Sequence, residues 1–180
     1  MMRSSPILWL AGAAPWAFAS PAHPGAAMNP ILPGMNPDPS CVTVPELSHT
    51  TFCTTSSFLL FPGAPVYASR DLQNWKHISN AFMDETQLPE LARRGTEAEG
   101  IWASTLRWKD GTFYLITSYV SWIGGWGPEL LLFTTDDVYD EGAWKGPLRV
   151  ENPGNDIDPD LFWDDDGTVY MSVAAGMYVS

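Results

Sequence analysis

One local pattern recurs along this chain and constrains its fold more than any other feature. A short polar segment precedes a strand-like run, which reaches a turn and returns as a second strand; the segments are Asp38–Cys41, Trp102–Thr105 and Asp158–Leu161. They begin about 55–65 residues apart, a spacing typical of β-propeller blades rather than of a single sheet. Because the innermost strand of each blade lines one central axis, residues ahead of those strands converge on one mouth of the channel. We therefore expect two carboxylates and an indole to gather in a polar, aromatic pocket of the kind that handles sugars.

The chain is predicted to be all-β, because short strand-like runs alternate with turns rich in Gly, Pro, Asn and Asp. The candidate strands are Cys41–Val44, Thr51–Phe58, Pro65–Ser69, Trp75–Ile78, Ser104–Trp108, Phe113–Tyr119, Leu130–Thr135, Trp144–Val150 and Val169–Val173, with Met177–Ser180 opening a further one. Blade 1 is predicted at about 36–82, blade 2 at about 101–150 and an incomplete blade 3 from 156. The charged stretch 83–100 is predicted to be a loop between blades, with Leu88–Arg94 as one or two helical turns. Because about two and a half blades cannot close a propeller, we expect the front part of a longer protein.

Composition and the amino-terminal sequence limit which partners and which cellular location are expected. A net charge of -12 and a pI near 4.3 argue against nucleic acid or an anionic membrane as a partner. Arg3, the apolar run Ile7–Phe18 and the small residues around Phe18 predict a signal peptide over 1–19, followed by a Pro/Ala/Gly linker over 20–28. Residues 29–180 are then the partial propeller domain of a secreted, extracellular protein.

Cysteines and histidines give no sign of a metal or cofactor. Cys41 and Cys53 fall in consecutive candidate strands, and an extracellular setting permits a disulfide, but sequence cannot set their Cα distance. Whether they pair therefore stays open. His23, His49 and His77 form no ligand pattern, so no cofactor is expected.

Several ordered motifs resemble glycoside hydrolase family 43, the β-xylosidase and α-L-arabinofuranosidase type. They are Asn29–Gly34, Asn36–Ser40, Ser57-Phe58 with Phe61–Gly63, Ser69–Trp75, Gly100–Ala103 and Ile157–Pro159 with the Asp-Asp-Asp-Gly turn. The resemblance covers nearly everything after the predicted signal peptide. It implies a five-bladed propeller, an oligosaccharide substrate from the plant cell wall, and a monomer at full length. A structural calcium is compatible with it, although the sequence shows no identifiable ligands.

The same resemblance assigns roles to individual residues. Asp38 looks like the general base, and Asp158 looks like the carboxylate that raises the pKa of the general acid. The neighbours Asp156 and Asp160 compete for that second role, and the Ile-Asp-Pro context selects Asp158. Trp102 and, more weakly, Phe58 are the predicted substrate-binding aromatics, with packing in the core as the alternative.

The general acid of the family is a glutamate in the next blade, and the sequence contains no glutamate after Asp158. Glu97, Glu99 and Glu129 do not match its position. The main hypothesis is therefore an amino-terminal part of an inverting glycosidase acting on xylo- or arabino-configured oligosaccharides, inactive by itself. The alternative hypothesis is a secreted sugar-binding fragment or pseudoenzyme without catalysis. The loop Val120–Glu129, which carries Trp122 and Trp126, is predicted to form a pocket wall in either case.

Overall fold

Antiparallel strands dominate the computed structural model, which describes residues 29–93, 96–174 and 176–179. The prediction of an all-β chain is confirmed, since the helical elements among these residues are short 3-10 turns. The predicted signal peptide and linker lie outside the described residues. Within the described part of the chain, no helix is long and apolar enough to span a membrane.

Sheet 1 contains four strands in chain order, β1 (Ser40–Val44), β2 (Thr50–Thr54), β3 (Gly63–Ser69) and β4 (Lys76–Phe82). A 3-10 helix, η1 (Pro45–Leu47), forms the turn between β1 and β2. Cys41 and Cys53 lie opposite each other in this pair and form a disulfide, with Cα atoms 4.1 Å apart. After β4 come the 3-10 helices η2 (Glu85–Gln87) and η3 (Pro89–Arg93), and η3 lies within the segment Leu88–Arg94 where one or two helical turns were expected.

Sheet 2 repeats this meander with β5 (Gly100–Lys109), β6 (Thr112–Val120), β7 (Glu129–Thr135) and β8 (Lys145–Val150). The 3-10 helix η4 (Glu141–Ala143) precedes β8. The β5–β6 hairpin turns at Asp110 and Gly111, which both have positive φ (49° and 87°). This conformation belongs to the tight hairpin turns that Asp-Gly favours.

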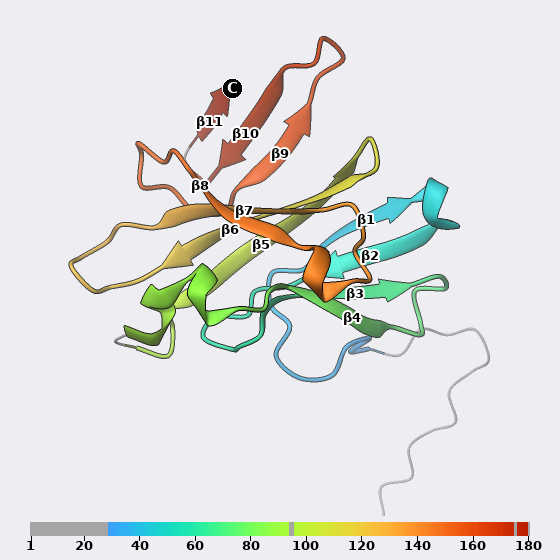
Figure 1. Cartoon of the computed structure of the whole chain (residues 1–180), viewed down its shortest axis with the longest axis horizontal. Coiled ribbons are helices and arrows are strands. Elements are labelled where there is room, and N and C mark those ends of the chain that lie inside the picture. The colour runs from blue at the N-terminus through green and yellow to red at the C-terminus, as the bar shows by residue number, and fades with distance from the viewer. Residues whose placement is uncertain (1–28, 94–95, 175, 180) are drawn as a thin grey trace, which may run out of the picture.

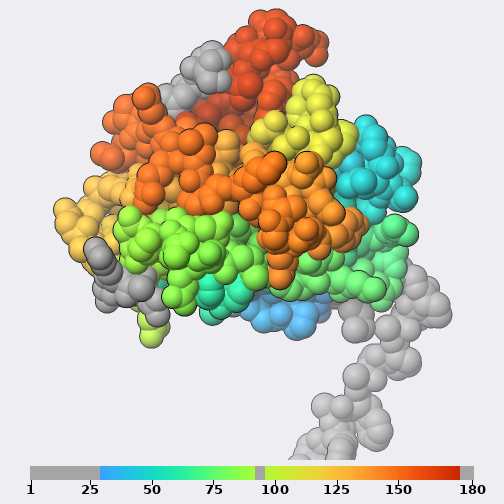
Figure 2. Space-filling model, in the orientation of Figure 1, coloured from blue at the N-terminus to red at the C-terminus, as the bar shows by residue number. Residues whose placement is uncertain are grey.

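Sheet 3 consists of β9 (Asp160–Trp163), β10 (Val169–Val173) and β11 (Gly176–Val179) in the order β11-β10-β9. The sheets follow one another through the molecule in chain order, and sheet 3 projects beyond the other two (Figures 1 and 2). The first strands of the sheets are neighbours, because β5 contacts both β1 and β9.

Two apolar clusters hold the sheets together. The larger one lies between sheets 1 and 2 and contains Phe52, Phe82, Phe113 and Phe133, all nearly inaccessible to solvent. The smaller one joins sheet 2 to sheet 3, with Ile116 and Leu130 on one side and Met171 and Val173 on the other. Arg107 adds a polar connection, since its Nη2 donates to Asp160 Oδ2 (2.6 Å) and its Nη1 contacts Ser40 Oγ (3.4 Å).

Among the predicted strand boundaries that were wrong, two have clear tertiary causes. The strand expected over Thr51–Phe58 ends at Thr54, because the chain then leaves sheet 1 and Phe58 forms an isolated bridge with Ile101. The strand expected to end at Ile78 continues to Phe82. Its polar residue Ser79 is buried and donates to the Val138 carbonyl (2.7 Å), so a polar position does not end the strand.

Candidate functional site

The recurring segments meet at one cavity of about 490 Å3. Its lining residues are Asp38, Pro39, Ser40, Trp102, Ala103, Ser104, Thr105, Ile157 and Asp158. Every sheet contributes, since these residues lie at or just before the first strand of sheet 1, sheet 2 or sheet 3. The structure thus brings the two predicted carboxylates and the predicted indole together from positions far apart in the sequence.

A shared backbone conformation marks the equivalent position in each segment. Asp38, Ala103 and Asp158 have φ values of 52°, 44° and 59°, in the left-handed region that few non-glycine residues adopt. The sequence pattern aligned Trp102 with the two aspartates, but the equivalent residue is Ala103, one position later. In sheet 2 this position falls at a β-bulge inside β5, so the strand begins before it rather than after it.

Two serines hold two of these positions, Ala103 and Asp158, in the same way. The Ala103 amide donates to Ser56 Oγ (2.6 Å), and the Asp158 amide donates to Ser118 Oγ (3.1 Å). In both cases the serine belongs to the preceding sheet or the segment that extends its second strand. Sequence reasoning missed both residues. The available signal was the repeated Thr-Ser pair, at 55–56 and again at 117–118.

The Asp38 carboxylate is fixed while its residue stays exposed at the cavity. Ser56 Oγ donates to Asp38 Oδ2 (2.6 Å), so the same buried hydroxyl that accepts from Ala103 also orients the carboxylate. A hydrogen bond to a charged acceptor is stronger than one between neutral groups. This arrangement is suited to a carboxylate that must point in one direction toward a bound molecule.

The charge of Asp38 affects the pKa of the second carboxylate, Asp158. Partial burial raises the pKa of Asp158 above its ordinary value, and the negative charge of Asp38 raises it further. The repulsion requires the two groups to be close enough to interact through the cavity. Its rivals Asp156 and Asp160 are not among the residues that line the cavity, and Asp160 forms the ion pair with Arg107. The structure therefore leaves Asp158 as the second acid of the cavity wall.

The predicted aromatic residues occupy different places. Trp102 lines the cavity, and its indole Nε1 donates to the Ala98 carbonyl (2.8 Å), which fixes the ring. Phe58 is not among the lining residues; its ring contacts Trp102 at a centroid distance of 6.0 Å. Phe58 thus supports the indole, and its backbone joins sheet 1 to sheet 2 through Ile101.

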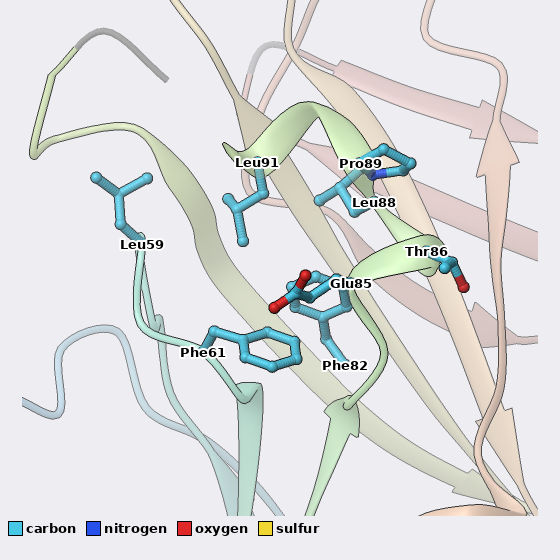
Figure 3. Close-up of a pocket in the computed structure, with 8 residues that line it drawn as sticks. All are labelled: Leu59, Phe61, Phe82, Glu85, Thr86, Leu88, Pro89 and Leu91. Carbon is cyan, nitrogen blue, oxygen red and sulfur yellow. The ribbon is translucent and has the colours of Figure 1, made fainter. Parts of the chain in front are cut away.

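A separate cavity of about 440 Å3 lies beside the 3-10 helices η2 and η3. Figure 3 shows its lining side chains, which are mostly apolar and come from the β2–β3 connection, the end of β4 and both helices. It shares no lining residue with the cavity at Asp38, and Glu85 is its one ionisable side chain. Without a second acid or base among these residues, it lacks the paired groups that acid–base chemistry needs.

Among the described residues, no group of three or more His, Cys, Asp or Glu side chains is arranged to hold a metal ion. Glu129 pairs with Arg149, and Glu90 also contacts that guanidinium (3.2 Å). These glutamates are therefore engaged in ion pairs outside the cavity.

Comparison with known proteins is consistent with this geometry. Residues 27–178 match the family described as Glycosyl hydrolases family 43. The chain is 40% identical over 146 residues to a xylan 1,3-beta-xylosidase of a Vibrio species, which covers 79% of the chain and 26% of that protein. It is 37% identical over 145 residues to a non-reducing end alpha-L-arabinofuranosidase of Bacteroides ovatus, covering 80% of the chain and 25% of that protein.

The chain also superposes on solved structures of similar proteins. A xylan beta-1,4-xylosidase from Bacillus halodurans superposes with a TM-score of 0.69 at 38% identity, covering 81% of this chain and 27% of that one. The GH43 protein BlXynB from Bacillus licheniformis reaches a TM-score of 0.72 at 26% identity, covering 85% and 30%. The chain spans about a quarter of the length of the curated relatives it matches.

Proposed function

Because this chain belongs to glycosyl hydrolase family 43, we propose that its cavity binds xylo- or arabino-configured units of plant cell-wall oligosaccharides for hydrolysis with inversion. The observation that carries the proposal is the placement of Asp38, Asp158 and Trp102 on one cavity. Two relatives named for xylosidase and arabinofuranosidase activity support this choice of sugars.

In this proposal Asp38 is the general base. Its carboxylate removes a proton from a water molecule as the water oxygen forms a bond to the anomeric carbon. The bond from that carbon to the leaving oxygen breaks on the opposite face, where a general acid delivers its proton. The proposal assigns the acid to a glutamate outside these 180 residues. The hydrogen bond from Ser56 suits Asp38 to its role, because it orients the carboxylate without covering it.

Asp158 is proposed to tune that general acid. A carboxylate near a second acid disfavours ionisation of both, so the acid retains its proton at higher pH. The behaviour of Asp158 supports this, because burial and the charge of Asp38 both raise its pKa. Trp102 is proposed to pack its indole face against the apolar C–H face of the sugar.

The proposal extends to architecture and location. The sheets are taken as successive blades of a five-bladed propeller, which the position of β5 between β1 and β9 supports. The amino-terminal sequence is taken as a signal peptide that directs the protein out of the cell, where the full-length protein works as a monomer.

The test is hydrolysis of xylo- and arabino-oligosaccharides by the natural protein that carries this chain, with Asp38→Asn as the variant. Loss of a general base should reduce kcat by about 10²-fold or more. Asp165→Asn, in the exposed β9–β10 turn, is the matched control and should leave kcat unchanged. Proton NMR of the first product identifies its anomer. Retention of near-normal turnover by Asp38→Asn would refute the assignment.

A second candidate function is sugar binding without hydrolysis. The observation in its favour is that the residues lining the cavity include two aspartates and no glutamate. Calorimetric titration of the natural protein with the same oligosaccharides, combined with the hydrolysis assay, separates the candidates. Saturable binding without product formation by the natural protein would favour this function over catalysis.

A further inference from the structure

Arg107 lies on β5 and contacts the strands that follow both cavity carboxylates, although it is not among the residues that line the cavity. Ser40 lies two residues after Asp38 in the sequence, and Asp160 has the same place after Asp158. The Arg107 guanidinium contacts both, through Nη2 to Asp160 Oδ2 (2.6 Å) and through Nη1 to Ser40 Oγ (3.4 Å). One side chain therefore connects the segment of the proposed general base to the segment of the second carboxylate.

Further contacts fix the guanidinium between these strands. Its Nη1 also donates to the Leu106 carbonyl on its own strand (2.9 Å), and the Leu106 amide donates to Ser40 Oγ (3.2 Å). The other carboxylate oxygen of Asp160, Oδ1, is buried and has no hydrogen-bond partner in the described part of the chain. Since a guanidinium holds its N–H groups in a rigid planar fork, its two partners are kept at a set spacing.

Neither stability nor direct contact with a bound molecule accounts for this arrangement. The side chains of Arg107 and Asp160 are 32% and 40% exposed, and ion pairs open to solvent contribute little to stability. Arg107 does not line the cavity, so it is not placed to touch a molecule bound there. Geometry is the remaining effect, and a catalytic group misplaced by about 1 Å can cost about 10²-fold in rate.

We propose that Arg107 is a positioning residue that sets the separation of the Asp38 and Asp158 carboxyl groups across the cavity. This inference rests on the proposed function and deepens it. The guanidinium holds the strand after Asp38 and the strand after Asp158 at one spacing. The general base then stands at a fixed distance from the acid that Asp158 tunes, as single displacement of a leaving group by water requires.

The test is steady-state hydrolysis of xylo- and arabino-oligosaccharides by the natural protein that carries this chain, with urea unfolding of each variant measured in parallel. Arg107→Met removes both contacts and leaves Asp160 charged and unpaired, so it should lower kcat and stability together. The double variant Arg107→Met with Asp160→Asn removes that charge, so stability should recover while kcat stays about tenfold or more below normal. KM should change less than about threefold, because the contacts of the cavity with the sugar are kept.

Two single variants complete the comparison. Arg107→Lys keeps the positive charge and an ion pair with Asp160, but an ammonium group lacks the planar fork that spans two partners. Its stability should be retained while kcat falls about threefold or more. Arg149→Met is the matched control, because Arg149 also pairs with two carboxylates, Glu129 and Glu90, and lies outside the cavity lining. This control should leave kcat unchanged.

The outcomes separate this inference from the proposed function. Normal kcat in the double variant or in Arg107→Lys would overturn the positioning role and leave the proposed function intact, since the ion pair would then serve stability alone. A rise in KM at unchanged kcat would also overturn it, because Arg107 would then contribute to binding rather than to alignment. Failure of the unaltered protein to hydrolyse these sugars, or normal turnover by Asp38→Asn, would overturn the proposed function and this inference with it.

Discussion

Replacing Ser56 by alanine should destabilise the chain more than its small change in volume suggests. The Ser56 hydroxyl donates to the Asp38 carboxylate and accepts from the Ala103 amide, each at 2.6 Å. It thereby joins the proposed general base of sheet 1 to the bulge of sheet 2. Ser56→Ala removes both hydrogen bonds at once and leaves two polar groups without this partner.

The magnitude follows from the charge and burial of these groups. A hydrogen bond to a charged acceptor contributes about 1.5–3 kcal/mol, and a partly buried amide left without a partner costs about 1 kcal/mol or more. We expect Ser56→Ala to lower the free energy of unfolding by about 3 kcal/mol. The neighbouring Ser57 provides a matched control, because both serines are 3% exposed. Ser57 Oγ accepts only from the Ala64 amide in the described part of the chain (3.0 Å), so Ser57→Ala should cost about 1–2 kcal/mol.

The assay is urea unfolding followed by tryptophan fluorescence, with both variants at the same pH and ionic strength. Ser56→Ala should be less stable than Ser57→Ala by at least about 1 kcal/mol. In an Asp38→Asn background this difference should shrink, since the acceptor has lost its charge. Equal costs for the two serines, or a difference that Asp38→Asn does not reduce, would refute the reasoning.

Further predictions concern pH, backbone geometry and the disulfide. Burial and the charge of Asp38 raise the pKa of Asp158, so the folded state binds this proton more tightly and stability falls as pH rises from the unfolded pKa through the folded one. Asp158→Asn should remove that fall and be more stable than the unaltered chain at neutral pH, measured by urea unfolding over a pH series; a steeper fall would contradict this. Gly100→Ala should lower stability by about 2–4 kcal/mol in thermal unfolding, because its Cβ would lie 2.0 Å from the Phe58 carbonyl oxygen at a φ of +108°. Gly111→Ala, with positive φ but nothing within 4 Å, should cost clearly less. Reduction of the disulfide between β1 and β2 should lower stability by about 3 kcal/mol, given a sequence separation of 12, and unchanged unfolding in reductant would exclude this contribution.

Local chemistry explains which parts of the fold the sequence could predict. Asp110-Gly111 predicts a tight hairpin turn because its requirement for positive φ is satisfied by the residues themselves. The Asp-Asp-Asp-Gly turn before β10 is local in the same sense, since Gly167 donates to the Asp164 carbonyl (3.0 Å) within the turn. Such features depend on neighbours a few residues away, so they can be read without knowing the rest of the molecule.

Strand ends and the site depend on distant contacts. β4 continues through the polar Ser79 because Val138 accepts its hydrogen bond, and β2 stops early because Phe58 pairs with Ile101. Neither partner is near in the sequence, so no local pattern could set these boundaries.

The recurrence of Asp-Pro ahead of a strand, together with the family resemblance, predicted Asp38 and Asp158 as site residues from the sequence. Only the tertiary structure decided that Ala103, rather than Trp102, is their equivalent, and that Ser56 and Ser118 hold the repeated conformation. The physical reason is that each of these hydrogen bonds crosses from one sheet to the next. The sequence supplies the two carboxylates. Their orientation and the electrostatic repulsion between them arise only where the sheets meet.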